Sequence, residues 1–101
     1  MTIRIRTELT GEIATVRALI KHPMETGNRK DPAGKALLPH YIREVICEHN
    51  SQPVLTARWG PGISKNPYLS FQFGGAKPGD RLTLRWEDNR GGRDSMTVTI
   101  E

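Results

Sequence analysis

Apolar and polar residues alternate along most of this chain, in short runs separated by turns rich in glycine and proline. An apolar residue at every second position is typical of a β-strand with one buried face. The pattern predicts seven strands and no helix, over residues 3–9, 13–20, 39–49, 53–59, 68–73, 81–87 and 96–100. Seven short strands with turn signals between them predict an all-β, immunoglobulin-like antiparallel β-sandwich. A barrel with the same number of strands is the alternative.

The chain length sets the expected domain organisation. A chain of 101 residues can bury one core but not two, so residues 1–101 are expected to form a single domain. No apolar run approaches the length needed to span a bilayer. Residues 1–6 enter directly into a strand pattern, without a basic leader followed by an apolar segment. Taken alone, this start predicts a cytoplasmic location.

Residues 59–71 form the stretch around which the rest of the chain is organised. They connect two predicted strands and contain two glycines and two prolines, which bend and stiffen the backbone. Ser64, Lys65 and Asn66 add polar groups to this connection, while Trp59 is expected to belong to the core. Loops held on a rigid scaffold often carry binding residues.

The longest connections are expected to meet at one end of the sandwich. Successive antiparallel strands reverse direction, so residues 21–38, 60–67 and 88–94 should lie at the same end. This end is the predicted functional face, loop-built and mildly cationic. Its charged residues are Lys21, Arg29, Lys30, Lys35, Lys65, Arg90 and Arg93, against Glu25, Asp31, Asp88 and Asp94.

Residues 21–38 are too many for a simple connection in so small a domain. Loops above roughly 12–15 residues are usually functional or disordered. Because residues 22–27 have restricted backbone and apolar atoms, an ordered binding segment is favoured over a passive loop. The residues expected to bind partners at this end are His22, Pro23, Met24, Glu25, Arg29, Trp59, Pro61, Ile63, Ser64, Lys65, Asn66 and Pro67.

The chain has one cysteine and three histidines, none with the spacing of a metal site. No metal or cofactor is therefore expected. Cys47 lies in a predicted strand among inward-facing residues, so an inert core thiol is favoured over a reactive nucleophile. His22 could titrate or bind an anion, although a single exposed histidine more often does neither. His40 and His49 are predicted to be surface residues near strand ends.

Charge and motif content favour a binding module over an enzyme. The net charge is +4 and ten of the fifteen cations are arginine, which suits anionic partners. Ser64 could lie near His22, but their spacing has no nucleophile signature. The glycine pairs lack the strand–loop–helix setting of a phosphate site. The aromatic residues alternate into strands and are expected in the core, so they do not predict a nucleic-acid stacking platform.

Four segments resemble the SoxZ family of sulfur-oxidation proteins: residues 21–27, 55–57, 59–71 and 75–80. The likeness extends in order over essentially the whole chain. It implies a non-catalytic subunit of the SoxYZ heterodimer, the carrier of a thiosulfate-oxidising system. In that system the sulfur intermediate is bound to a cysteine on the C-terminal tail of SoxY, and Cys47 does not match that cysteine. The subunit is then expected to stabilise SoxY and to help present its tail to partner enzymes.

The resemblance also changes the expected location and partners. The system works in the periplasm, and the subunit is expected to be exported already bound to SoxY, which carries a twin-arginine signal. Contacts with the other Sox enzymes are expected to be transient, with no nucleic acid and no membrane as partner. Either the loop end or an exposed sheet face or edge is expected to meet SoxY. An independent small-anion or nucleic-acid binding module is the alternative function.

Overall fold

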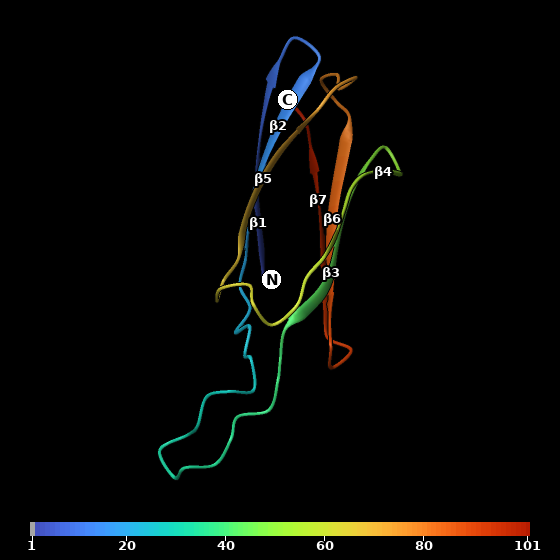
Figure 1. Cartoon of the computed structure of the whole chain (residues 1–101). Coiled ribbons are helices and arrows are strands. Elements are labelled where there is room, and N and C mark those ends of the chain that lie inside the picture. The colour runs from blue at the N-terminus through green and yellow to red at the C-terminus, as the bar shows by residue number, and fades with distance from the viewer. Residues whose placement is uncertain (1) are drawn as a thin grey trace.

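The computed structural model describes residues 2–101 as two antiparallel sheets packed face to face (Figure 1). One sheet has the strand order β1-β2-β5 and the other has the order β4-β3-β6-β7. This arrangement confirms the predicted immunoglobulin-like sandwich rather than a barrel. The strands are β1 (Ile3–Thr10), β2 (Ile13–Ile20), β3 (Ile42–His49), β4 (Gln52–Arg58), β5 (Tyr68–Phe73), β6 (Arg81–Asp88) and β7 (Arg93–Thr99).

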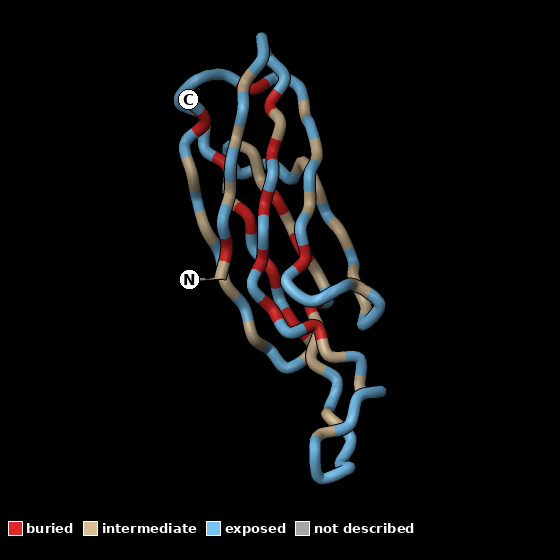
Figure 2. Tube along the Cα trace, turned by 90° about the vertical axis from the view of Figure 1, so that its left-hand side faces the viewer, coloured by how far each residue is buried: buried red, intermediate tan, exposed pale blue. Residues whose placement is uncertain are grey.

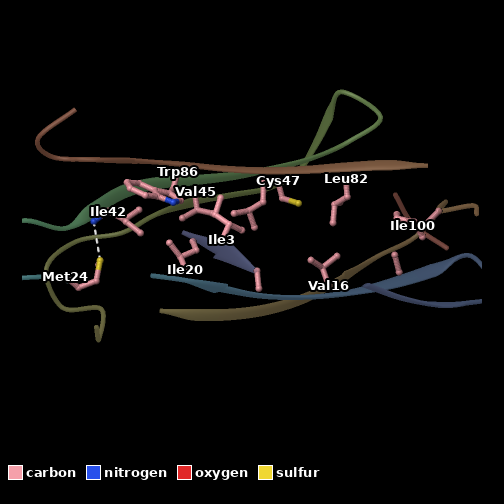
Figure 3. Close-up of a cluster of buried hydrophobic side chains, with 14 residues drawn as sticks. Ile3, Val16, Ile20, Met24, Ile42, Val45, Cys47, Leu82, Trp86 and Ile100 are labelled. Carbon is pink, nitrogen blue, oxygen red and sulfur yellow. Dashed lines mark hydrogen bonds between the residues drawn. The ribbon is translucent and has the colours of Figure 1, made fainter. Parts of the chain in front are cut away.

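The core lies between the inner faces of the two sheets. More and less exposed residues alternate along β1, β2, β5, β6 and β7, because successive side chains point to opposite faces (Figure 2). In β2 the buried face consists of Ala14, Val16, Ala18 and Ile20, as predicted. Figure 3 shows how side chains from the two sheets meet across this layer.

Polar contacts close the side of the sandwich where β1 faces β7. The backbone N–H of Thr2 and its hydroxyl both donate to Asp94 Oδ2, at 2.9 and 2.8 Å. The indole N–H of Trp86 donates to the hydroxyl oxygen of Thr2 at 3.0 Å. These bonds connect the start of β1 to β6 and β7 across the two sheets.

Two strands start three residues away from their predicted positions, and the other boundaries agree within one residue. β3 begins at Ile42 rather than at residue 39. Pro39 has no backbone N–H, and Tyr41 N–H donates to Asn89 Oδ1 instead of to a neighbouring strand. β7 begins at Arg93, three residues before the predicted start, because Arg93 already pairs with Glu87 of β6.

Residues 21–41 form an ordered, hairpin-like arm, called here the long hairpin. Its two sides are connected by isolated bridges between Glu25 and His40 and between Lys30 and Ala36. Gly27 lies tightly against the returning chain with φ +92°, and a Cβ there would come within 2.8 Å of Pro39 Cγ. The segment is therefore a folded arm, and its expected binding role stays a prediction. It extends the chain beyond the sandwich, as Figure 1 shows, and the longest dimension is 54 Å.

Within residues 2–101 there is no helix of the length and hydropathy needed to cross a bilayer.

Candidate functional site

Three connections meet at one end of the sandwich, as predicted. They are the long hairpin, the β4–β5 loop (residues 59–67) and the β6–β7 turn (residues 89–92), which all lie at the lower end of Figure 1. We call this region the loop end. The short β1–β2 turn and the β5–β6 turn lie at the opposite end.

A cluster of two histidines and one aspartate holds the loop end together. His22 Nε2 lies 3.0 Å and His40 Nε2 lies 2.8 Å from the same oxygen, Asp88 Oδ2. Both histidines belong to the long hairpin, and Asp88 is the last residue of β6. The side chains of His22 and Asp88 are 2% and 3% exposed, while that of His40 is 27% exposed. The cluster therefore fixes both sides of the long hairpin to the end of one core strand.

The hydrogen bonds around His22 determine its tautomer. The backbone N–H of Met24 donates to His22 Nδ1 at 3.1 Å, so Nδ1 carries no proton. The proton of the neutral ring is then on Nε2, which donates it to Asp88 Oδ2. Met24 has a positive φ of 48°, a conformation that costs a non-glycine residue about 1 kcal/mol or more. The bond to His22 and the burial of Met24 offset this cost.

Asp88 is fully occupied as an acceptor. Its second oxygen, Oδ1, accepts hydrogen bonds from the backbone N–H groups of Arg90 and Gly92, at 2.9 and 2.7 Å. Burial raises the pKa of Asp88, but the bonds from His22, His40 and these two amides outweigh burial and lower the pKa to about 2. Asp88 is thus an ionised carboxylate at neutral pH, and it also folds the β6–β7 turn around itself.

His22 stays neutral at neutral pH for a different reason. Burial lowers the pKa of His22, the bond to Asp88 opposes this change, and the nearby His40 lowers the pKa further. The net direction is downward. The Trp86 ring packs edge-on against His22 with centroids 5.2 Å apart, which adds to the apolar surroundings of the imidazole.

The backbone of His22 brings in the third connection. Its N–H donates to Asn66 Oδ1 at 3.0 Å, and its carbonyl accepts from the N–H of Asn66 at 2.9 Å. Asn66 has φ 52°, a conformation that asparagine tolerates better than most residues. His22 therefore connects all three parts of the loop end: the long hairpin, the β4–β5 loop and the β6–β7 turn.

The composition of the cluster also raises the possibility of a metal site. The three ligand atoms lie within 4.8 Å of one another. A histidine that binds a metal through Nε2 carries its proton on Nδ1 and donates it to an acceptor. Here the group facing Nδ1 of His22 is the Met24 N–H, itself a donor. The hydrogen bonds therefore fit a neutral imidazole on a carboxylate better than a metal ligand.

The residues predicted to bind partners divide into two groups. Pro23, Pro61, Ser64, Lys65, Asn66 and Arg29 are exposed at the loop end. His22, Met24 and Pro67 are buried, while Glu25, Trp59 and Ile63 are half-buried. The buried side chains serve the fold of the loop end, and a partner binding there would touch the exposed ones. Their binding role stays a prediction.

The expectation that His22 is an exposed histidine is wrong, since its side chain is 2% exposed. His40, predicted to be a surface residue, is 27% exposed and also bonds to Asp88. His49 bonds to Asp80 Oδ2 at 2.7 Å and packs on Phe73, so its side chain is only 15% exposed. Asp88 was counted among surface charges. The alternation Leu82, Leu84, Trp86 places it at the next inward position, and that signal could have identified it.

The remaining candidates for chemistry are accounted for by their surroundings. Cys47 is fully buried, and burial raises the pKa of its thiol to about 12, which fits the predicted inert core residue. Ser64 is exposed. His22 cannot act as its base, because both ring nitrogens of His22 already bond to Asp88 and Met24.

The loop end is therefore a hydrogen-bonded surface centred on the histidine–aspartate cluster. Comparison with known proteins agrees with the sequence resemblance. The family described as sulphur oxidation protein SoxZ matches residues 3–99. The chain belongs to the SoxZ family. This membership places it in sulfur oxidation.

Two solved structures share the fold of this SoxZ-family chain. A hypothetical protein, PH1083 from Pyrococcus horikoshii OT3, superposes with a TM-score of 0.71 at 18% identity, over 100% of this chain and 88% of the other. A superoxide reductase in the oxidised state superposes with a TM-score of 0.65 at 20% identity, over 99% of this chain and 87% of the other. At such identity the likeness concerns the fold. None of the curated protein sequences matches the chain significantly.

Proposed function

We propose that this chain is the non-catalytic subunit of a SoxYZ sulfur-carrier heterodimer in thiosulfate oxidation. It stabilises SoxY and helps to present the cysteine-bearing tail of SoxY to the enzymes of the system. The observation that carries the proposal is the match to the SoxZ family over residues 3–99.

The state of Cys47 supports this division of labour. A thiol must reach solvent and ionise to form a bond with a sulfur intermediate. Cys47 is the one cysteine of the sequence, it is 0% exposed, and its pKa is raised to about 12. This buried thiol is poorly suited to hold a sulfur intermediate, which supports a carrier cysteine on another chain.

The loop end supports a docking role for the same subunit. Ser64, Lys65 and Arg29 are exposed on loops that the histidine–aspartate cluster holds together. A surface that is already ordered loses little conformational entropy on binding. We propose that SoxY binds at this end.

Co-expression with SoxY and affinity purification test the proposed function. We expect a stable heterodimer that, with the other Sox components, oxidises thiosulfate at the same rate, within about twofold, when Cys47→Ala replaces the wild type. A folded Cys47→Ala subunit that abolishes turnover would contradict the proposal. Failure of the chain to co-purify with SoxY would also contradict the proposal.

Charge reversal at the loop end tests the docking surface separately. Lys65→Glu with Arg29→Glu should dissociate the heterodimer if SoxY binds there. If the heterodimer survives and only turnover falls, the loop end instead faces the enzymes. Cell fractionation tests the proposed periplasmic location: the chain should reach the periplasm only when it is co-expressed with SoxY and its export signal.

A further inference from the structure

The two sheets differ in how their arginines are arranged. On the four-stranded sheet, three arginines each lie beside a glutamate of a neighbouring strand. These pairs are Arg58–Glu44, Arg85–Glu48 and Arg93–Glu87. Arg43 and Arg81 of the same sheet have no carboxylate within 4.0 Å among residues 2–101, but neither lies directly opposite another arginine.

The outer face of the three-stranded sheet carries an excess of positive charge. Arg4, Arg6 and Arg17 are all exposed on it. Arg17 has a partner, Glu8, at 3.6 Å. Within residues 2–101, no carboxylate lies within 4.0 Å of Arg4 or Arg6. We call Arg4, Arg6 and Arg17 the arginine face.

The strand register concentrates this charge instead of spreading it. Arg6 of β1 is directly opposite Arg17 of β2. Like charges at directly opposed positions destabilise a sheet. The fold alone gives no reason for this arrangement, since a glutamine or glutamate at residue 6 would remove the repulsion.

Two large apolar side chains lie beside the arginines. Leu19 is opposite Arg4 on one side and opposite Tyr68 on the other, so the three form one row across the sheet. Leu19 is 39% exposed and Tyr68 is 59% exposed. Arginine and tyrosine are enriched at protein interfaces and among the residues that contribute most to binding.

We propose that the arginine face, with Leu19 and Tyr68, docks the acidic surface of a transient protein partner. The proposal rests on the proposed function, in which the partner is an enzyme of the sulfur-oxidation system and the carrier must bind and leave on each turn. The interface of a permanent subunit is more apolar than this face. Three arginines around two apolar side chains instead suit an encounter that is steered by charge.

A nucleic acid fits the same face less well. Proteins that bind duplexes commonly neutralise six to ten phosphates, whereas this face offers three arginines, of which Arg17 already pairs with Glu8. Tyr68 is the one exposed aromatic residue beside them, and a stacking platform needs successive rings.

The test compares two double variants in the heterodimer with SoxY. Arg4→Glu with Arg6→Glu changes the arginine face. Arg43→Glu with Arg81→Glu is the matched control, with the same residue change and the same change in net charge at exposed positions of β3 and β6. The rate of thiosulfate oxidation is measured in the reconstituted system, as a function of heterodimer concentration and of salt.

We expect the arginine-face variant to form the heterodimer normally and to lower kcat/KM for the carrier by about tenfold at low salt. Its rate should depend little on salt, whereas the rate with the wild type should fall as salt rises. The control should stay within about twofold of the wild type. The variant should also melt no lower than the wild type, because Arg6→Glu places a carboxylate opposite Arg17.

Four results would overturn the inference. If both variants match the wild type, or both lose activity equally, the position of the charge is irrelevant. If the arginine-face variant loses SoxY, the face belongs to the permanent interface. If the isolated chain binds duplex DNA and this variant abolishes the binding, the partner is a nucleic acid. If the wild-type chain does not co-purify with SoxY, the proposed function itself is refuted. The first three results would overturn only the inference about the arginine face.

Discussion

Replacing Asp88 removes the centre of the histidine–aspartate cluster and should lower the free energy of unfolding. In Asp88→Ala, the buried N–H of His22 and the amides of Arg90 and Gly92 lose their acceptors. His40 is 27% exposed and can turn to water. A buried donor left without a partner costs about 1–3 kcal/mol, and a half-buried amide costs less.

The summed cost of Asp88→Ala is therefore about 3–5 kcal/mol. Asp88→Asn should cost less, about 1–3 kcal/mol, because its amide oxygen can still accept from Arg90 and Gly92. Its NH₂ group would, however, face the N–H of His22, which cannot change tautomer without losing the bond from Met24. For a chain of this size, the alanine variant should melt about 15–30 °C below the wild type.

Denaturant unfolding at pH 7 measures both variants. Glu87→Gln is the matched control: it removes the same charge from the neighbouring position, where the side chain is half exposed, and should change the free energy of unfolding by less than about 0.5 kcal/mol. Hydrogen exchange should show loss of protection at the amides of Met24 and Gly92. If Asp88→Ala unfolds at the same denaturant concentration as the control, the cluster does not stabilise the loop end, and the reasoning fails.

Four further outcomes follow from the same geometry. The free energy of unfolding should fall in two steps as the pH is lowered. Below about pH 6.5 it falls because the unfolded chain binds a proton at His22, while the lowered pKa of His22 keeps the folded chain from doing so. Between about pH 4 and pH 2 it falls by about 2 kcal/mol more, because the unfolded chain protonates Asp88 before the folded chain does. A pH titration of stability checks this, and His22→Gln should remove the first step. Gly92→Ala should destabilise the chain by about 1–3 kcal/mol, since its Cβ would lie 2.6 Å from the Asp88 carboxylate, whereas Gly62→Ala, in open space, should be neutral in the same melt. Cys47 should resist thiol reagents at pH 8 until the chain unfolds, as followed by labelling against denaturant.

The alternation of apolar residues was enough to predict most of the sandwich. β2 and β5 have the predicted bounds, because in both strands every second side chain faces the core. The meeting of three connections at one end also followed from the sequence, since it needs only the count of reversing strands. The start of β3 did not follow, because Tyr41 bonds to Asn89, a residue 48 positions away.

The histidine–aspartate cluster was not predicted either, because its residues are far apart in the sequence. His22 and Asp88 are 66 residues apart, and His40 and Asp88 are 48 apart, so no local spacing connects them. His22 precedes Pro23, and without knowledge of its contact with Asp88 it was expected to be exposed. Burial of His22 depends on Trp86, Asn66 and Asp88, which reach it only after the two sheets pack.

The most direct test of the central claim is the intact mass of each subunit in the purified heterodimer after treatment with thiosulfate and the Sox enzymes. SoxY should gain the mass of a sulfur adduct, while this chain should keep its unmodified mass. An adduct on this chain, at Cys47, would contradict the claim that it holds its partner in place without carrying the sulfur itself.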